Sequence, residues 1–406
     1  MIHLIIGAGA AGITAAKTLR ELDSDAAIIM ISADEFVHSR CMLHKYISAE
    51  RNEKTLSFVS DHFFEENDIM WMNKTYVNHV DTASQEVELQ DGTHMFYDKL
   101  LIATGANSII PPIGHFKESK NVFGLRNLSD AQQISNLSAS ANRILIVGSG
   151  LVGMDAAYAF LEMHKNVTII EMADRILPTQ LDATAGKAYQ KLFEQHGCKF
   201  ILGKKASETI QNKDGNIEAV ILDDGTKIEC DLIIVAAGVC PAVACVDNTD
   251  IATERFIIVD DFLQTSDKNI YAAGDVTGLS AIWPNAMKQG QIAAYNMCGK
   301  KVQYLDQYAM KNTMNFYGLT TLSLGRGIAD ENDKVIICED ANNYKKAILK
   351  DGCLSHIMLQ GNIDYSGIYQ FLIKNKIKLH LDKTDIFHLS FADFYKIDKT
   401  GQYTYQ

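Results

Sequence analysis

Two glycine-rich segments of the chain have the spacing of a loop that binds the pyrophosphate of a dinucleotide. Each follows a short apolar run and precedes a segment that favours a helix. The glycines are Gly7, Gly9 and Gly12 in the first segment and Gly148, Gly150 and Gly153 in the second. In this setting the first glycine makes the strand-to-helix turn, the second lets a pyrophosphate approach the backbone, and the third lets the helix pack on the strand. The repetition predicts two dinucleotide sites.

An acidic residue distinguishes the second site from the first. Glu171 ends the apolar segment 166–170, close to the spacing of about 20 residues that a ribose-binding carboxylate has in such folds. Such a carboxylate accepts a hydrogen bond from the ribose 2′-hydroxyl and repels a 2′-phosphate, so it favours NADH over NADPH. The alternative is a solvated acid at the end of a strand. In the first copy Ser32 stands at this point, with Asp34 and Glu35 just beyond, so the usual acid is displaced or missing. The glycines carry the assignment of a dinucleotide there, and Ser32 and Asp34 are the candidates for the ribose contact.

The elements around both loops repeat in the same order. A hairpin signal, Asp-Gly-Thr, follows each loop at residues 91–93 and 224–226. An apolar strand then ends at a glycine, Gly105 in one copy and Gly238 in the other, at the same distance from the hairpin both times. This repeat predicts an α/β fold with two doubly wound, Rossmann-like nucleotide-binding units.

Composition sets limits on the partners and the compartment. The 406 residues carry a net charge of -12, which argues against a general affinity for nucleic acid or for an anionic membrane surface. No apolar run reaches the roughly 18–20 residues that span a bilayer, and the N-terminus has no basic leader, so no membrane segment is expected. The eight cysteines are scattered and form no C-x-x-C pair. We therefore expect a cytoplasmic protein with reduced thiols.

Beyond the glycine loops, three segments resemble conserved features of a known family. They are IATG at Ile102–Gly105, VAAGVCP at Val235–Pro241 and TSDKNIYAAGDV at Thr265–Val276. With them the chain resembles the two-dinucleotide-binding flavoproteins of the pyridine nucleotide-disulfide oxidoreductase superfamily. It is most similar to NADH:rubredoxin and ferredoxin reductases and to the flavin domain of nitrite reductase.

The resemblance implies a domain organisation and two cofactors, FAD and NADH. An FAD-binding domain of residues 1–109 and 243–308 would be interrupted by an NADH-binding domain of residues 110–242. Residues 309–406 would form a small α/β domain, similar to the dimerisation or flavin-covering domain of these proteins. The aromatic-rich tail 387–406 has no assigned role.

The resemblance also implies which residues hold the cofactors. Asp275 takes the position of the aspartate that holds the flavin ribitol hydroxyls. The other implied FAD contacts are Ala11, Arg40, Lys45, Val77, Ala103, Thr104, Gly105, Arg126, Gly274 and Trp283. For NADH they are Val152 and Gly238, in addition to the second glycine loop and Glu171.

The segment 38–46 would lie against the flavin ring and supply the catalytic groups. The resemblance places Lys45 near the flavin N5, where an ammonium stabilises an anionic reduced flavin. It places Asp155 as the acid that pairs with Lys45. The alternative is that both are unrelated surface charges.

Cys41 in the same segment leaves two interpretations open. Its spacing to Tyr46 resembles that around the redox cysteine of NADH oxidases, peroxidases and coenzyme A-disulfide reductases, and Arg40 and Lys45 would favour its thiolate. Against this, Ala10 stands where the peroxidases have a histidine. The other interpretation is a buried cysteine that only packs. No metal site is predicted, because the cysteine and its neighbouring histidines lack a fourth ligand.

These observations predict an FAD-dependent enzyme that takes electrons from NADH and gives them to a separate iron–sulfur carrier of the ferredoxin or rubredoxin type. The carrier must be separate because the chain has no iron–sulfur motif of its own. One alternative is a Cys41-dependent disulfide reductase or NADH oxidase, and another is a flavin-bearing subunit that mainly docks other proteins. The acceptor, the physiological direction, and the choice between a homodimer and a subunit of a larger redox complex stay open.

Overall fold

A computed structural model describes residues 1–305, 311–379 and 385–405, which form two compact units. The first unit consists of Met1–Asp174 and His196–Leu305, and the second of Arg175–Gln195 and Asp306–Gln406. Residues 175–195, assigned to the NADH-binding domain from the sequence, therefore group with the C-terminal part of the chain. The predicted boundary between residues 308 and 309 lies outside the described residues, and the division into three domains stays a prediction.

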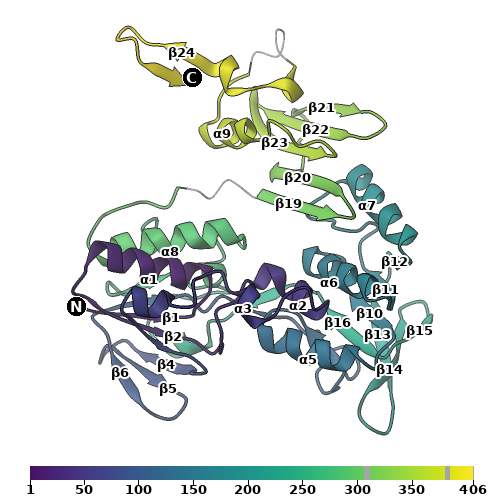
Figure 1. Cartoon of the computed structure of the whole chain (residues 1–406), viewed down its shortest axis with the longest axis horizontal. Helices are drawn as coiled ribbons and strands as arrows, with labels where there is room; N and C mark the ends of the chain where they lie inside the picture. Colours follow the sequence, from purple (N-terminus) through teal and green to yellow (C-terminus); the bar gives the residue numbers. More distant parts are fainter. Residues whose placement is uncertain (306–310, 380–384, 406) are drawn as a thin grey trace. The chain divides into compact units, whose positions relative to one another are not determined.

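The first half of the repeat is a parallel five-stranded sheet in the order β18-β7-β1-β2-β3 (Figure 1). Its strands are β1 (Ile2–Ile6), β2 (Ala27–Ile31), β3 (Ile69–Met72), β7 (Lys99–Ile102) and β18 (Ile270–Ala272). Side chains alternate between its faces. Ile5 packs with the helices α1 (Ala10–Leu22) and α8 (Trp283–Met297). Leu4 faces the three-stranded sheet of β4 (Val77–Asp81), β5 (Glu86–Leu89) and β6 (His94–Phe96).

The second half has the same plan, with the parallel order β12-β11-β10-β16-β9. Its strands are β9 (Val122–Gly124), β10 (Arg143–Val147), β11 (Asn166–Glu171), β12 (Lys199–Leu202) and β16 (Leu232–Val235). The helices α5 (Leu128–Ser138) and α6 (Leu151–Glu162) accompany this sheet. A second three-stranded sheet contains β13 (Ala206–Gln211), β14 (Ile217–Leu222) and β15 (Lys227–Glu229).

The two halves confirm the predicted repeat strand by strand. The strand before each glycine loop pairs in parallel with the next strand on one side and with the strand of the closing glycine on the other. Both predicted hairpins form, and in each the glycine has a positive φ, +81° at Gly92 and +85° at Gly225. The same backbone requirement therefore produced the same sequence signal twice.

Short elements complete the first unit. They are η1 (Arg40–Met42), α2 (Leu43–Ile47), α3 (Glu53–Leu56), α4 (Phe63–Glu66), η2 (Ala244–Val246), η3 (Asp275–Thr277) and the antiparallel pair β8 (Ala106–Ser108) and β17 (Val239–Pro241). The pair β8–β17 joins the segments that pass between the predicted FAD-binding and NADH-binding domains.

The second unit is built on an antiparallel five-stranded sheet, in agreement with the small α/β domain expected at the C-terminus. Its order is β19-β20-β23-β22-β21. The elements are α7 (Ala183–Gln195), β19 (Lys311–Phe316), β20 (Leu319–Gly325), β21 (Lys334–Glu339), β22 (Tyr344–Lys350), β23 (Cys353–Gln360) and α9 (Gly367–Asn375). Asp182 accepts hydrogen bonds from Tyr344 Oη at 2.6 Å and Lys346 Nζ at 3.0 Å, which attaches the segment of α7 to this sheet.

The tail 387–406, which had no assigned role, continues the second unit as far as residue 405. It contains part of η4 (Ile386–His388), then η5 (Phe391–Phe394) and a hairpin of β24 (Tyr395–Ile397) and β25 (Tyr403–Tyr405). Gln406 lies outside the described residues. Within the described part of the chain, every helix is too short or too polar to cross a membrane.

Candidate functional site

The first and third glycines of each loop are required by the fold itself. Gly7 and Gly148 have φ angles of +110° and +104°, which other residues rarely adopt. A Cβ atom at Gly12 would lie 1.9 Å from the carbonyl oxygen of Gly7, and one at Gly153 would lie 2.1 Å from that of Gly148. These contacts confirm the turn and the close helix packing inferred from the sequence.

The second glycine of each loop faces open space. A Cβ atom at Gly9 or Gly150 would meet no other atom of the described residues within 4 Å. Each of these glycines is the N-cap of its helix, α1 or α6, and none of the described side chains caps either helix start. The first backbone N–H groups of both helices are therefore available to an anion, which fits a bound pyrophosphate at each loop.

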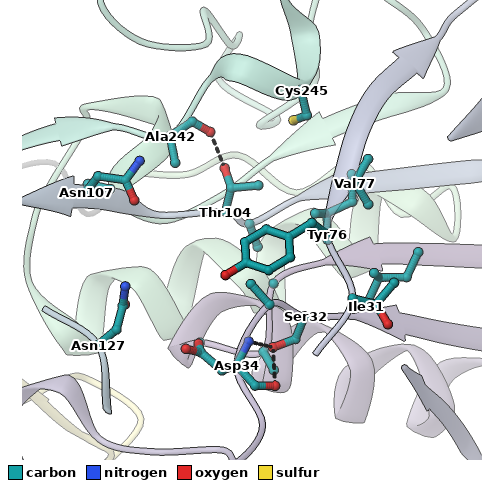
Figure 2. Close-up of a pocket in the computed structure, with 18 of the residues that line it drawn as sticks. Ile31, Ser32, Asp34, Tyr76, Val77, Thr104, Asn107, Asn127, Ala242 and Cys245 are labelled. Atoms are coloured by element: carbon teal, nitrogen blue, oxygen red, sulfur yellow. Dashed lines mark hydrogen bonds between the residues drawn. The ribbon is translucent and has the colours of Figure 1, made fainter. Parts of the chain in front are cut away.

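A cavity of about 680 Å³ opens beside the first loop, large enough for a cofactor (Figure 2). Many residues predicted to bind FAD line it, from the segments that follow β1, β2 and β7 and from the start of β4. They are Gly7, Gly9, Ser32, Asp34, Arg40, Val77, Ala103 and Thr104. The structure thus brings together residues that are up to about a hundred positions apart in the chain. The volume of the cavity and the hydrogen-bonding groups that line it fit the adenosine and pyrophosphate part of FAD.

Several polar residues of this cavity were missed from the sequence, among them Tyr76, Asn107 and Asn127. Tyr76 precedes β4, Asn107 lies on β8 and Asn127 caps α5, and all three line the cavity with their side chains drawn in Figure 2. Thr104 Oγ1 donates to the carbonyl oxygen of Ala242 at 2.7 Å, which fixes another lining segment. Asn127 stands in the signature Asn-x-x-Asp of a helix N-cap and was detectable, whereas Tyr76 and Asn107 belong to no motif.

Two ion pairs organise the predicted FAD residues. Arg40 pairs with Asp34 at 3.1 Å, and Arg126 pairs with Asp275 at 2.6 Å. Both pairs are mostly buried, so their charges are only partly screened by water. Ser32 accepts the backbone N–H of Asp34 at 3.1 Å, which makes Ser32 and Asp34 a local turn.

Gln289, which the sequence did not identify as a site residue, fixes the backbone of the loop that contains Asp275. Gly274 N donates to Gln289 Oε1 at 2.7 Å, and Gln289 is fully buried. A Cβ atom at Gly290 would lie 2.0 Å from the carbonyl oxygen of Ala11, so α8 and α1 cross in close contact (Figure 1). This contact explains why residue 290 is a glycine.

Eight predicted FAD residues lie outside the cavity lining: Ala11, Gly12, Lys45, Gly105, Arg126, Gly274, Asp275 and Trp283. Gly105 is beside the Arg126 guanidinium, since a Cβ atom there would lie 3.6 Å from Nη2. Trp283 begins α8 and packs edge-on against Phe58, with ring centroids 4.7 Å apart. Their roles toward FAD stay predictions.

The predicted ion pair between Lys45 and Asp155 is wrong, because Lys45 has a different partner in the structure. Lys45 Nζ pairs with Glu50 Oε2 at 3.0 Å, since Lys45 lies on α2 and Glu50 follows the end of that helix. Asp155 on α6 instead faces His44, with 3.9 Å between Oδ2 and Nδ1. Lys45 still acts on Asp155 through space and lowers its pKa. The segment 38–46 and the start of α6 therefore do come together, as the sequence suggested.

Burial dominates the titration of Asp155 and His44. Desolvation raises the pKa of the Asp155 carboxyl to about 7, against the opposing effect of Lys45. Desolvation also lowers the pKa of His44 to about 4, with a further lowering by Lys45. His44 is therefore neutral at pH 7, and its contact with Asp155 is not a pair of full charges.

The free energy of unfolding of the wild type should fall as the pH rises through the range in which only the folded Asp155 keeps its proton. We expect that Asp155→Asn does not show this fall. Asp155 keeps its proton in the folded chain up to about pH 7, but an unfolded aspartate loses it near pH 4. The wild-type free energy of unfolding therefore falls between these values, and the variant does not share that fall. Because 30% of the Asp155 side chain is exposed, we expect a relative gain of about 2 kcal/mol, roughly half of full linkage.

Urea unfolding of the FAD-loaded protein at a series of pH values between about 4 and 8 measures this gain. Asp25→Asn, at an exposed aspartate, is the control and should keep a constant difference from wild type. A constant difference for Asp155→Asn as well would contradict the raised pKa.

Both sequence interpretations of Cys41 need correction. The residue is exposed, so it is not a buried packing residue. The expectation that Arg40 and Lys45 favour its thiolate is also wrong, because desolvation by the protein around the sulfur raises the pKa of the Cys41 thiol and Asp155 raises it further. Arg40 is turned to Asp34 and Lys45 to Glu50, so their charges are engaged elsewhere.

The second dinucleotide site is marked by Glu171 at the end of β11. Glu171 Oε2 accepts both the backbone N–H and the hydroxyl of Ser149, each at 2.8 Å, and Oε1 accepts the N–H of Ala173 at 2.8 Å. The carboxylate therefore stands directly against the second glycine loop. Val152 is 42% exposed, and a Cβ atom at Gly238 would meet no other atom of the described residues within 4 Å, both consistent with a surface open to a ligand.

Comparisons with known proteins agree with this geometry. The model of the family described as pyridine nucleotide-disulphide oxidoreductase matches residues 1–290. The chain is 29% identical over 391 residues to the NADH-dependent phenylglyoxylate dehydrogenase subunit epsilon of Aromatoleum evansii, covering 93% of this chain and 92% of that protein.

Two further relatives have different names. The identity is 32% over 324 residues to an NADH oxidase of Methanocaldococcus jannaschii, covering 75% of this chain and 71% of that protein. It is 29% over 312 residues to the rubredoxin-NAD(+) reductase of Pseudomonas putida, covering 74% and 80%. A solved ferredoxin reductase from Rhodopseudomonas palustris matches with a TM-score of 0.85 and 22% identity, covering 93% of this chain and 95% of that one. This last likeness confirms the predicted fold.

The family model and the relatives confirm the predicted cofactors, FAD and NADH, and the predicted class of enzyme, an FAD-dependent NADH oxidoreductase. The glycine loops, the cavity beside the first loop and the acid beside the second are the features of this chain that fit those cofactors. The chain belongs to the pyridine nucleotide-disulphide oxidoreductase family.

Proposed function

We propose that the enzyme delivers electrons from NADH to a separate iron–sulfur carrier of the ferredoxin or rubredoxin type. The observation that carries this proposal is the environment of Cys41. It is the only cysteine of the segment 38–46, it forms no disulfide, and its thiol pKa is raised. A dithiol relay needs a second cysteine nearby, and a single-thiolate relay needs a lowered thiol pKa. The relative named rubredoxin-NAD(+) reductase, covered over 80% of its length, supports the same acceptor class.

The residues of the chain have distinct tasks in this proposal. The two glycine loops hold the pyrophosphates, and Asp275 and Arg126 form the polar pair beside the first site. Glu50 holds the Lys45 ammonium in place at the segment 38–46. Asp155, with its pKa near neutrality, can hold or release a proton there at physiological pH. Bound FAD supplies the conversion between a two-electron donor and a one-electron acceptor.

A second candidate function is that of an NADH oxidase, which would need no protein partner. The relative of that name, 32% identical to this chain, is the observation that favours it.

The relative named as a subunit, covered over 92% of its length, supports work within a larger redox complex. A homodimer is the other arrangement, and the mass of the purified protein in solution distinguishes the two.

The test of the proposed function is an anaerobic titration with NADH, followed by an acceptor panel. We expect stoichiometric bleaching of the flavin by NADH, then rapid reoxidation by ferredoxin or rubredoxin. Reoxidation by oxygen or by a disulfide should be slow. Fast turnover with oxygen alone would favour the oxidase, and fast turnover with a disulfide would favour the thiol-dependent reductase.

We expect Cys41→Ser to keep NADH-dependent flavin reduction and at least about half of the rate of carrier reduction, since a thiol with a raised pKa is a poor relay. Stopped-flow reduction and acceptor assays measure both steps. Cys240→Ser, at another exposed cysteine, is the matched control. If flavin reduction stays fast while turnover with every acceptor is lost, electrons pass through Cys41 and the proposed acceptor class is wrong.

A further inference from the structure

We infer that Ser149, inside the second glycine loop, determines the preference for NADH over NADPH by holding Glu171 in position. The inference rests on the proposed role of Glu171 as the ribose-binding acid and goes one residue beyond it. Ser149 is not one of the loop glycines, and its own side chain carries the argument.

Both hydrogen-bond donors of Ser149 are directed at Glu171. It is fully buried, and both its N–H and its hydroxyl donate to the same oxygen, Glu171 Oε2, each at 2.8 Å. The N–H of Ala173 occupies the other oxygen at 2.8 Å. A carboxylate has about four acceptor sites, so three are filled by the protein and one remains. That one suits a ribose hydroxyl.

Fixing the carboxylate matters because discrimination against NADPH depends on repulsion. A glutamate that can rotate toward water makes room for a 2′-phosphate and loses most of the repulsion to solvent screening. Two hydrogen bonds from Ser149 oppose that rotation, and the one from its hydroxyl depends on the side chain. The negative charge therefore stays where a 2′-phosphate would lie.

The first half of the repeat provides an internal comparison. There Ala8 takes the place of Ser149, and Ser32 takes the place of Glu171. Ser32 forms its hydrogen bonds with Asp34 in a local turn. The loop hydroxyl is therefore absent from the half in which there is no strand-end carboxylate to hold. The two residues differ together between the halves, as a working pair should.

The test compares Ser149→Ala with wild type in steady-state kinetics with NADH and with NADPH. We expect the ratio of kcat/KM for NADH to that for NADPH to fall about tenfold, mainly through a lower KM for NADPH, because a Glu171 carboxylate that has lost one hydrogen bond can turn away from a 2′-phosphate. FAD content, Tm and kcat with NADH should change little. Ser138→Ala is the matched control, at a buried serine whose hydroxyl stays within α5.

A double-mutant cycle with Glu171→Gln separates the inference from the role on which it rests. If Ser149 acts through Glu171, Ser149→Ala should have no further effect in the Glu171→Gln background. An unchanged cofactor ratio in Glu171→Gln alone would overturn the role of Glu171. A changed ratio in Glu171→Gln with none in Ser149→Ala would overturn the inference about Ser149. Should Ser149→Ala not fold, Ser149→Gly removes the same hydroxyl, and the same outcomes apply.

Discussion

Asp275→Ala is expected to give a folded protein that no longer retains FAD. The carboxylate is 17% exposed and pairs with Arg126 at 2.6 Å. Its loop is fixed independently, because Gly274 has a φ of +86° and donates its N–H to the buried Gln289. The substitution removes the proposed acceptor for the ribitol hydroxyls and leaves the loop in place. Losing hydrogen bonds to a charged group should weaken FAD binding roughly 100-fold.

The ratio of flavin absorbance to protein absorbance after desalting measures this loss, and a titration of the apoprotein with FAD gives the change in Kd. Asp261→Ala, at an exposed aspartate before β18, is the control and should keep its flavin. Retention of stoichiometric FAD by Asp275→Ala would show that Asp275 does not hold the cofactor.

Arg126 needs a separate variant, because Asp275→Ala also leaves its guanidinium without its ion-pair partner. Asp275→Asn keeps a polar side chain of the same size but removes the charge. If Asp275→Asn retains FAD while Asp275→Ala loses it, hydrogen bonding to the cofactor is the main role. If both lose it equally, the ion pair with Arg126 is what organises the site.

Local backbone requirements explain what the sequence could predict. Gly7, Gly12, Gly92 and Gly105 each either adopt a positive φ or lie against a neighbouring backbone oxygen, and glycine satisfies such conditions most readily. These conditions depend on a few neighbouring residues, so they leave a signature that can be read directly. The repeat, the hairpins and the parallel sheets follow from them.

The partners of the charged residues could not be predicted, because they depend on how distant segments meet. Lys45 was matched with Asp155 by resemblance, but Glu50 lies nearer to it along the same turn of chain. The residues of the pair Arg126 and Asp275 are 149 positions apart, and nothing in either segment names the other. The same holds for Tyr76, which reaches the cavity only because β4 begins beside β2 in space.

The grouping of residues 175–195 with the C-terminal part follows the same logic. From the sequence this segment continues the second nucleotide-binding unit. In the structure, Asp182 is bound by Tyr344 and Lys346, and the Tyr189 hydroxyl donates to the carbonyl oxygen of Leu319 at 2.7 Å. The sequence does not show which sheet will provide the hydrogen-bond partners of a polar side chain. Tertiary contacts, and not local propensity, decide where such a helix belongs.

Gly150→Val and Gly9→Val are expected to empty one dinucleotide site each while the protein stays folded. Both glycines are helix N-caps with ordinary negative φ angles, -68° and -82°, that valine can adopt. Neither faces another atom of the described chain within 4 Å of an added Cβ. Valine at an N-cap should cost only about 1 kcal/mol of stability. Its side chain, however, would occupy the space through which a pyrophosphate approaches the helix start.

We therefore expect Gly150→Val to keep its FAD and to raise the KM for NADH by roughly 100-fold, because the pyrophosphate can no longer reach the backbone N–H groups. Gly9→Val should instead purify without flavin. Gly12→Val and Gly153→Val provide the contrast, since their side chains would collide with the Gly7 and Gly148 carbonyls and should prevent folding.

Flavin content, Tm and NADH kinetics for the four variants distinguish a glycine kept for the ligand from one kept for the fold. Flavin loss in Gly150→Val, or tight NADH binding by it, would contradict the assignment of the second loop to NADH. Loss of folding in Gly9→Val and Gly150→Val would show that the open space beside these glycines is needed by the chain itself. The assignment of each loop to its own cofactor thus depends on two variants failing in two different ways.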